Sequence, residues 1–379
     1  MKVGIIGGGI TGLTTALALH KCGVASAVYE QAKQINEIGA GILIQPNAIK
    51  VFNWLGITNE IRKAGIELNN MEITNEHLIS FKKIKNKVVQ DEEGNKTIAI
   101  HRGRLQNLLQ AEVKKSTEIH LNKKYINHIA GRNGIKINFE NGEENVDVLL
   151  GADGINSAVR KILFPESSLR NTKQVCWRGI AKLKLPSTLR KEGKEAWGKQ
   201  IRFGYSPIAE NEIYWFAVAN EGQQQKAAEV GIKKYLSILF EDFTIIIREI
   251  IAHTDPSSIH ETIVYDLNRL PVWHKDNICL MGDAAHATTP NMGQGACQGI
   301  EDAYYMSKLF PKTGPFNKHI FDQFESQRRK KVDYIVNTSW TFGKMAHSPF
   351  GQPIMKLLFK MTPKGVMNSQ MKKLYSIDK

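Results

Sequence analysis

Six residues near the start of the chain have the types and the spacing of a phosphate-binding loop. Gly7-Gly8-Gly9-Ile10-Thr11-Gly12 fits the pattern G-x-G-x-x-G, whose glycines allow a tight turn, a close approach to a pyrophosphate and close helix–strand contact. Glu30, eighteen residues after Gly12, is an acidic side chain that can accept both hydroxyls of an adenosine ribose. The pattern predicts a dinucleotide site over a coincidental glycine turn. Its expected residues are Gly7, Gly9, Gly12, Glu30 and Gln31.

Two later segments also place an aspartate directly after an apolar strand. Val146–Leu150 leads into a Gly-Ala-Asp-Gly turn that contains Asp153, and Ile278–Met281 leads into Gly-Asp, which ends at Asp283. Ligands of open α/β sheets bind beyond the carboxyl ends of the strands. We therefore expect all three strand ends to converge on one ligand.

The elements that we expect to position these residues start at the beginning of the sequence. Lys2–Ile6 reads as a buried strand, Thr11–Cys22 as a helix closed by Gly23, and Ser26–Tyr29 as a second strand. This βαβ unit predicts an α/β fold with a Rossmann-like nucleotide-binding domain. A helix is expected from about Gln294 to Leu309, and the region after residue 317 has helical composition.

Two stretches with β-rich alternation interrupt this domain and predict an inserted sheet. The pattern is clear in segments such as Ile213-Tyr214-Trp215-Phe216. We expect a discontinuous nucleotide-binding domain, an inserted β-sheet domain and a basic tail. Their expected ranges are 1–70, 98–175 and 267–345 for the first, 71–97 and 176–266 for the second, and 346–379 for the tail.

Composition narrows the class of protein. Of 379 residues, 42% are hydrophobic and 23% charged, which is ordinary for a globular chain and argues against long disorder. The four cysteines form no C-x-x-C pair, so a disulfide framework or a cysteine zinc site is not expected, and a reducing cytoplasm is. Val3–Leu19 carries no charge but contains five glycines, which a signal peptide or membrane span would not.

The net charge of +14 is concentrated near the C-terminus. From Arg328 onward there are eleven Lys and Arg residues against two aspartates. A solvated basic face, attraction of an anionic cofactor and weak contact with an anionic membrane surface all fit this pattern. Nucleic-acid binding is not expected, because no recognised binding module accompanies the charge.

Five motifs in a fixed order resemble the single-component FAD-dependent monooxygenases, the family of the aromatic hydroxylases. They are Gly7–Gly12, Glu30, His101–Leu105, Gly151–Arg160 and Gly282–His286. The resemblance runs from residue 1 to about residue 335. Thr289–Asp302 is similar to the branch of zeaxanthin epoxidases and urate hydroxylases, although many members have asparagine at the position of Cys297. The resemblance implies an aromatic hydroxylase-type fold with an FAD-binding domain and an inserted substrate domain.

The resemblance also implies roles for individual residues. Asp283 would hold a ribityl hydroxyl of FAD, with a helix N-cap as the alternative. The backbone around Gly293 would face the pyrimidine edge of the flavin and stabilise negative charge there. Asp153 and Arg160 match a second fingerprint, associated with FAD and NAD(P)H, although a surface salt bridge would equally explain Arg160. The implied cofactor-binding residues are Gly41, Leu43, Arg102, Asp153, Arg160, Asp283, Pro290, Gly293, Gln294, Gly295, Ala296 and Cys297.

The implied activity is that of a monooxygenase. It would use NAD(P)H as a transient co-substrate and O2 to hydroxylate an aromatic or heteroaromatic substrate, or to epoxidise an isoprenoid. No catalytic side chain and no metal ligand set are expected, because the flavin carries the chemistry; His286 is expected to be structural. The alternatives are an FAD-linked reductase or halogenase of the same fold and a flavin-binding regulator without turnover.

The substrate pocket is the least constrained part of the site. By position, several side chains of the inserted sheet could point toward the flavin. They are Trp177, Arg178, Gln200, Arg202, Tyr214 and Phe216. The substrate, the choice of NADH or NADPH and the oligomeric state stay open.

Overall fold

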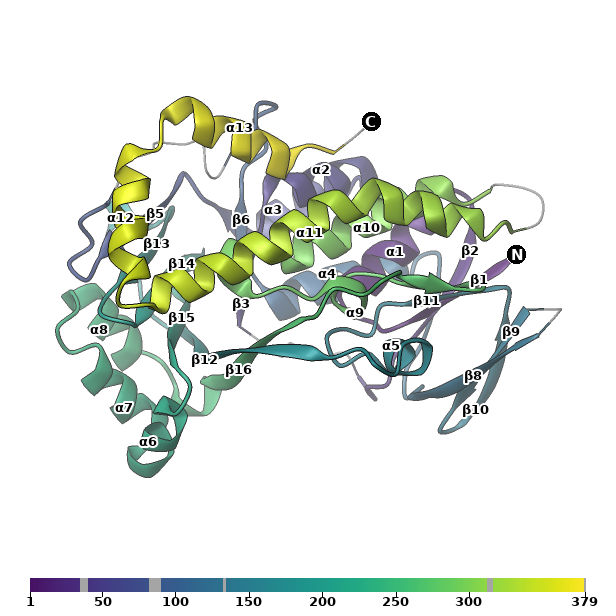
Figure 1. The fold of residues 1–379 in the computed structure, drawn as a ribbon, viewed down its shortest axis with the longest axis horizontal. Coiled ribbons are helices and arrows are strands. Elements are labelled where there is room, and N and C mark those ends of the chain that lie inside the picture. Colours follow the sequence, from purple (N-terminus) through teal and green to yellow (C-terminus); the bar gives the residue numbers. More distant parts are fainter. Residues whose placement is uncertain (35–39, 82–89, 132–133, 312–315, 378–379) are drawn as a thin grey trace.

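A six-stranded sheet forms the middle of the nucleotide-binding half of the computed structural model, which describes residues 1–34, 40–81, 90–131, 134–311 and 316–377 (Figure 1). Its strand order is β17 (His274–Lys275), β18 (Ile278–Leu280), β11 (Val148–Gly151), β1 (Lys2–Ile6), β2 (Ala25–Tyr29) and β7 (Glu118–His120). All neighbours are parallel except the β17–β18 pair. The expected βαβ unit is confirmed, with α1 (Ile10–Lys21) joining β1 to β2.

Layers cover both faces of this sheet because its strands are apolar on both sides. Ile5 faces α1, which packs against α10 (Gly295–Leu309) and α4 (Arg102–Val113). On the other face, Val146 packs closely over Gly4, because a Cβ at Gly4 would lie 3.0 Å from a methyl group of that valine. This side chain belongs to a three-stranded antiparallel sheet of β8 (Tyr125–Gly131), β9 (Gly134–Phe139) and β10 (Gly142–Val146).

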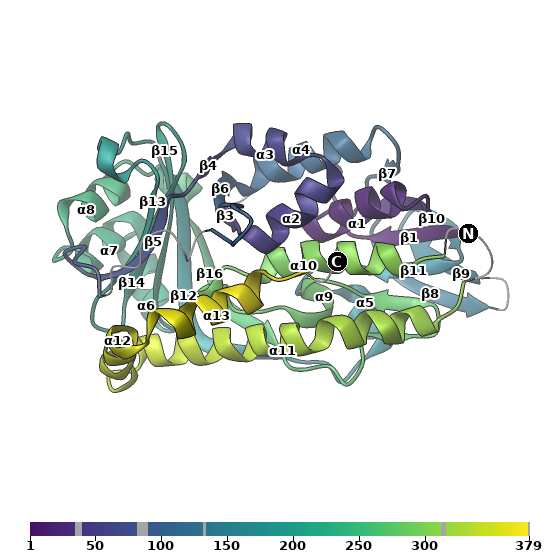
Figure 2. The same cartoon turned by 90° about the horizontal axis from the view of Figure 1, so that it is seen from above.

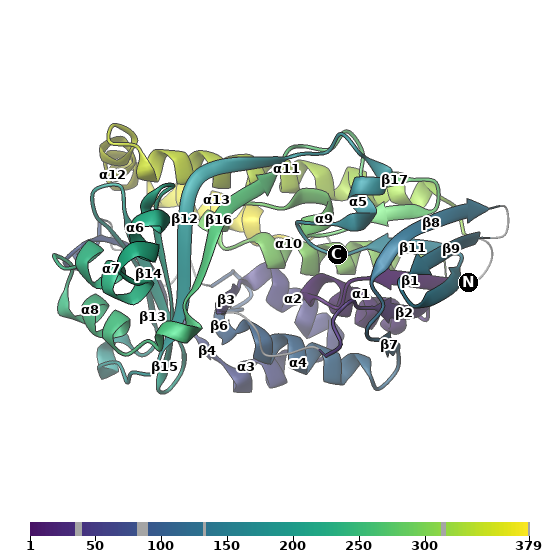
Figure 3. The ribbon, with the colours of Figure 1, turned by 90° about the horizontal axis from the view of Figure 1, so that it is seen from below.

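A second six-stranded sheet forms the other half of the molecule (Figure 2). Its order is β16 (His260–Leu267), β12 (Leu169–Ala181), β15 (Glu212–Asn220), β14 (Arg202–Ala209), β13 (Glu192–Trp197) and β5 (Asn70–Asn75). One face packs on α6 (Gln223–Val230), α7 (Ile232–Leu239) and α8 (Ile245–Ala252). The long strands β12 and β16 reach back toward the first sheet (Figure 3). Part of the expected insertion, residues 82–89, lies outside the described residues.

A small sheet lies between the two halves. It pairs β3 (Gly41–Ile44), β6 (Ile98–His101) and β4 (Gly65–Glu67). Leu43 of β3 packs in one apolar cluster with Tyr214 and Ile180 of the large sheet. The remaining helices of these halves are α2 (Pro46–Leu55), α3 (Thr58–Ala64), α5 (Ala158–Leu163) and α9 (Asp283–His286).

The C-terminal region is helical throughout its described length. α11 (His319–His347) crosses the molecule, α12 (Gly351–Met361) lies along one end, and α13 (Lys364–Tyr375) runs back along α11 (Figure 1). The expected short basic tail instead forms α12 and α13 over its described length, and Leu374 and Tyr375 pack against Ile335 of α11. No helix among the described residues is long and apolar enough to cross a membrane.

Candidate cofactor and substrate site

The glycine loop after β1 has the shape that its spacing predicts. Gly7 has a φ of +110°, and a Cβ there would lie 2.5 Å from the Ala152 carbonyl oxygen. A Cβ at Gly12 would lie 1.9 Å from the Gly7 carbonyl oxygen, whereas a Cβ at Gly9 would meet nothing within 4 Å. The loop is therefore tight at both ends and open above Gly9. The first turn of α1 has no side-chain cap and contains no acidic residue, which leaves its amides available to a pyrophosphate.

Glu30 lies beside this loop at the end of β2. One carboxylate oxygen accepts a hydrogen bond from the Gly8 amide at 2.6 Å, and the other accepts from the Ala32 amide at 2.8 Å. Each oxygen keeps acceptor capacity for a ribose hydroxyl. Gln31 is exposed next to it. The structure thus shows a positioning role for Glu30 toward the loop, and ribose binding by Glu30 and Gln31 stays a prediction.

Asp283 follows β18 at the start of α9. The N-cap of this helix is Gly282, so the N-cap alternative for the aspartate is wrong. The Asp283 carboxylate has no hydrogen-bond partner among the described residues and remains exposed. Surrounding protein nevertheless raises its pKa, while the His286 and Arg102 charges oppose the rise. An accessible carboxylate without a protein partner is suited to accept hydrogen bonds from ligand hydroxyls.

The turn after β11, the third strand end, is stabilised by the side chains of Asp153 and Arg160, which point into the protein. Asp153 accepts from the Ser157 hydroxyl at 2.5 Å and the Ala158 amide at 2.7 Å, so it caps α5. Arg160 is only 2% exposed and donates to the carbonyl oxygens of Ile155 (2.6 Å) and Ala284 (3.1 Å). The surface salt bridge considered for Arg160 is therefore wrong, because the side chain is buried and ties α5 to α9. Direct contact of either residue with FAD or NAD(P)H stays a prediction.

The loop before α10 meets strand β3, as the convergence of the motifs predicts. The Gln45 amide donates to Cys297 Sγ at 3.4 Å, and the Gln45 side-chain amide donates to the Met292 carbonyl oxygen at 2.8 Å. Burial raises the pKa of the Cys297 thiol to about 12, so it stays neutral. Gly293 has a φ of +62° at the turn into α10, whose first turn has no acidic residue.

Hydrogen bonds therefore bring together the two segments that carry the expected flavin-facing residues. They are Gly41 and Leu43 on one side and Pro290, Gly293, Gln294, Gly295, Ala296 and Cys297 on the other. Their individual contacts with the cofactor stay predictions.

A buried ionic network supports α10 from below, and sequence reasoning missed most of it. Arg328 of α11 donates to Glu301 at 2.5 Å and to Asp302 at 2.8 Å. His286 Nε2 lies 2.6 Å from the Asp302 carboxylate, which also accepts from the Gly282 amide at 2.8 Å. Burial opposes ionisation, but His286 and Arg328 hold the pKa of Asp302 at about 2. The adjacent acidic pair in the middle of a buried helix was the available signal.

Strand alternation divides the substrate candidates between the two faces of the large sheet. Trp177 is fully buried on the face that α7 covers, where its ring lies 6.0 Å from Tyr235. Its expected place in the substrate pocket is therefore wrong. Tyr214 and Phe216 lie on the opposite face, with ring centroids 6.2 Å apart. A Cβ at Gly41 would lie 2.4 Å from Tyr214, which places this tyrosine directly against β3.

Of the three remaining candidates, Arg178 lies opposite Phe216 on β12, and Arg202 and Gln200 lie farther along the same sheet. Arg202 is 2% exposed and donates to Glu195 at 3.0 Å and to Asn291 at 2.7 Å. Because Asn291 belongs to the loop before α10, Arg202 joins the large sheet to that loop. Gln200 lies in the turn between β13 and β14, has a φ of +61° and accepts from Asn220 at 3.4 Å. Neither side chain is placed beside Tyr214.

These features define a dinucleotide-binding flavoprotein fold with an inserted substrate sheet. The family model "FAD binding domain" matches residues 1–339, and the chain therefore belongs to that family. The resemblance to the single-component FAD-dependent monooxygenases, the aromatic hydroxylase-type fold and FAD as cofactor are confirmed.

The similarity to individual proteins extends over nearly the whole chain. Aurachin C monooxygenase/isomerase of Stigmatella aurantiaca is 35% identical over 355 residues, with 91% of this chain and 90% of the relative covered. The 2-heptyl-3-hydroxy-4(1H)-quinolone synthase of Pseudomonas aeruginosa is 27% identical, with 96% and 94% covered. The fold of Klebsiella pneumoniae HpxO, crystallised with FAD and uric acid, matches with a TM-score of 0.87 at 22% identity and 99% and 96% coverage.

Proposed function

We propose that the protein is an NAD(P)H-dependent FAD monooxygenase that transfers one oxygen atom of O2 to a planar aromatic or heteroaromatic substrate. The observation that carries this proposal is the unpaired, accessible Asp283 carboxylate, whose Oδ1 would lie 3.8 Å from a Cβ at Gly295 in the first turn of α10. The family and the full-length similarity to an aurachin C monooxygenase support the reaction class.

Bound FAD, once reduced by NAD(P)H, supplies the reaction with O2. The protein supplies binding and electrostatics. The amides around Gly9 would bind the pyrophosphate, Glu30 and Asp283 would accept hydrogen bonds from hydroxyl groups, and the uncapped N-terminus of α10 would stabilise negative charge on the flavin. Tyr214 and Phe216 hold a flat substrate and exclude water from it.

A ring hydroxylation is favoured over an isoprenoid epoxidation by the walls of the pocket. Tyr214 and Phe216 present two aromatic rings inclined by 41° on the face toward β3, and such a surface suits a flat ring. The relatives named for quinolone and urate chemistry fit the same substrate class. NAD(P)H is proposed to dock transiently in the cleft near Arg160, and the protein to work in the cytoplasm.

The experiment that separates this proposal from its alternatives is a screen on purified, FAD-loaded protein. Planar ring compounds that include hydroxyquinolines and hydroxybenzoates are tested for stimulation of NADH or NADPH oxidation with and without O2. A monooxygenase shows substrate-stimulated oxidation that requires O2, because reduction is gated by substrate. Oxidation that proceeds equally well with another acceptor identifies the reductase alternative, and no turnover identifies the regulator.

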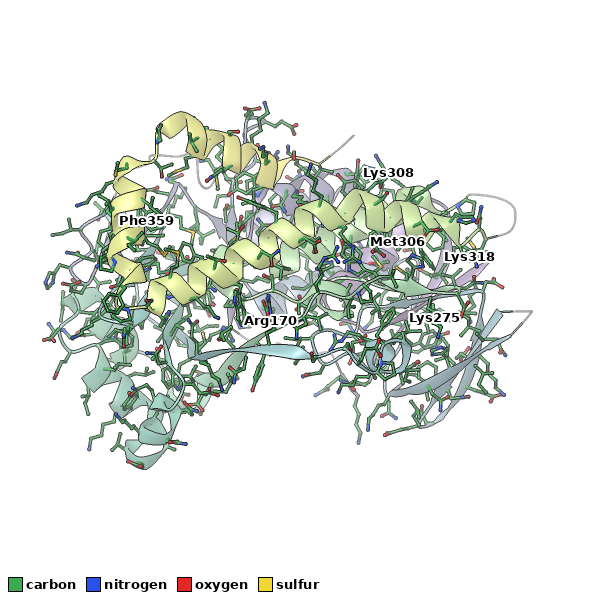
Figure 4. The ribbon with its side chains drawn as sticks, viewed as in Figure 1. Arg170, Lys275, Met306, Lys308, Lys318 and Phe359 are labelled. Carbon is green, nitrogen blue, oxygen red and sulfur yellow. The ribbon has the colours of Figure 1, made fainter. Side chains whose placement is uncertain are left out.

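We also propose that α12 contacts anionic membrane surfaces. One stripe of this helix, continued by the preceding turn, is apolar and exposed: Phe350, Ile354, Leu357, Leu358 and Met361, with Phe350 83% exposed. Figure 4 shows α12 at the end of the molecule far from Lys318, with Phe359 of the same helix labelled. A groove of about 380 Å³ between α11 and α12 extends this apolar surface.

Charge gives the reason for choosing a bilayer as the partner. Residues 334–377 contain six lysines and no acidic residue. Lys344 and Lys360 are exposed beside the apolar stripe. An amphipathic helix with cationic flanks is attracted to anionic lipid and inserts its apolar face at the headgroup level. A second copy of the chain, with the same positive charge, would be repelled from this surface.

A further inference from the structure

Arg178 lies in the substrate-facing side of the large sheet, between the two halves of the molecule. It is directly opposite Phe216 in the β12–β15 register. Its neighbour two residues along β12, Ile180, packs with Tyr214 and with Leu43 of β3. Because side chains alternate along a strand, Arg178 and Ile180 share this face. Its immediate sequence neighbour Trp177 faces the opposite side.

The guanidinium of Arg178 has only neutral partners. It donates to the Thr262 hydroxyl at 3.0 Å, and the Tyr214 phenol lies near it. Among the described residues no carboxylate forms an ion pair with it. Arg202 and Arg328, two of the buried arginines, pair with Glu195 and with the acidic pair of α10 respectively, whereas the buried Arg160 donates to main-chain carbonyl oxygens.

This difference has an energetic consequence. A guanidinium carries five N–H donors, and the Thr262 hydroxyl uses one of them. Surrounding protein penalises an unpaired charge, and an anion that approaches it gains both Coulomb energy and charge-assisted hydrogen bonds. The position of Arg178 beside the Tyr214 and Phe216 rings means that this anion would be carried by a flat molecule on those rings.

We propose that Arg178 anchors an anionic or strongly polarised oxygen of a planar substrate and thereby selects the substrate class. The inference rests on the proposed function, because it assigns the substrate of that same site. The ring of the substrate lies on Tyr214 and Phe216, and its carboxylate, enolate or vinylogous-amide oxygen meets the guanidinium.

Tyr214 completes the oxygen site. Burial raises the pKa of its phenol to about 12, while the Arg178 charge opposes the rise. At neutral pH the hydroxyl is therefore protonated, and it donates to the same substrate oxygen while its own oxygen accepts from Arg178. A cation next to a ring oxygen also favours the ionised, electron-rich form of the substrate, which is the form that an electrophilic oxygen donor attacks most readily.

The test compares matched probes on the FAD-loaded protein. The probe pairs are 4-hydroxyquinoline with quinoline, which lacks the polarised oxygen, and benzoate with benzamide, which lacks the negative charge. Dissociation constants come from the change in flavin absorbance. The variants are Arg178→Met, Arg178→Lys and, as matched control, Arg248→Met, which makes the same change at an exposed position of α8.

We expect the wild type to prefer the first member of at least one pair by tenfold or more. Arg178→Met should abolish that preference by weakening only this probe, about ten- to a hundredfold, the range for hydrogen bonds to a charged group. Arg178→Lys should retain part of it, and Arg248→Met all of it. The thermal midpoint of Arg178→Met should not fall, because the lost cation has no ion pair.

Two results would overturn the inference while leaving the proposed function intact. One is a wild type that binds FAD but shows no preference within either pair. The other is a preference that survives in Arg178→Met, measured also in Arg178→Gln in case the methionine variant does not fold. A protein that binds no FAD contradicts the proposed function itself, and the two failures are therefore distinguishable.

Discussion

At the residue scale, Asp283 and Asp302, nineteen positions apart, have different roles in one site. One is available to a ligand, and the other stabilises the fold. Asp302 is fully buried, paired with His286 and Arg328, and held at a pKa of about 2. Asp283 has no such partner, and its pKa is raised by the surrounding protein. The first carboxylate holds α10 in place, and the second is kept for a ligand.

Replacing Asp283 should weaken FAD binding without unfolding the protein. Asp283→Ala removes an acceptor of ribityl hydroxyls, and we expect a loss of about 1.5–3 kcal/mol, the scale of hydrogen bonds to a charged group. The apoprotein should melt at an equal or higher temperature at neutral pH, because a carboxylate with a raised folded-state pKa costs stability when it is ionised. Flavin titration and thermal melting check both parts. Unchanged flavin affinity would remove the assigned role.

Replacing Asp302 should have the opposite effect on stability. Asp302→Asn leaves Arg328 and His286 without their partner, and breaking such a buried pair costs about 3–5 kcal/mol. Because the folded-state pKa of Asp302 lies below the ordinary aspartate value of 3.8, the wild type carries this stability above about pH 4 and loses it as the pH falls toward 2. Thermal melting from pH 2 to 7 should show the two proteins converging at the acidic end. A constant difference across this range would contradict the account.

At the scale of elements, α12 carries the prediction for membrane contact. The protein should co-sediment with vesicles that contain anionic lipid but not with neutral vesicles, and added salt should release it. Leu357→Ser with Leu358→Ser should reduce binding strongly, while Ile129→Ser, a matched change at an exposed position on β8, should not. Binding that is equal for neutral vesicles, or a chain that dimerises through this helix instead, would contradict the proposal.

The elements differ in how far the sequence could predict them. The strand and helix around the glycine loop follow from local rules, because Gly7 and Gly12 have contacts that no side chain can replace. The face of the sheet on which Trp177 lies depends on the side that α7 covers. This long-range packing cannot be predicted from the local sequence pattern. The C-terminal helices were underestimated because Leu374 and Tyr375 gain their burial only from α11.

At the scale of the whole molecule, α10 and α11 connect the two halves and the C-terminus. Arg328 and Lys331 of α11 both donate to Glu301 of α10, and Lys331 also donates to the Ser376 carbonyl oxygen at 2.8 Å. Buried ion pairs thus hold α10 in place beneath the predicted flavin contacts. From sequence, the order of the motifs predicts that they converge on one ligand, whereas the inward-facing roles of Asp153 and Arg160 could not be predicted, because they depend on packing between α5 and α9.

The central claim is that this cleft inserts one atom of O2 into a ring substrate. The measurement that tests it most directly is product analysis under 18O2, with a ring compound that stimulates NAD(P)H oxidation by the FAD-loaded protein. We expect a product that contains one 18O atom, with the second 18O atom recovered in water. No label should enter the product when the reaction runs in H2(18)O with ordinary O2. A product oxygen that comes from water, or turnover that proceeds equally well without O2, would contradict it.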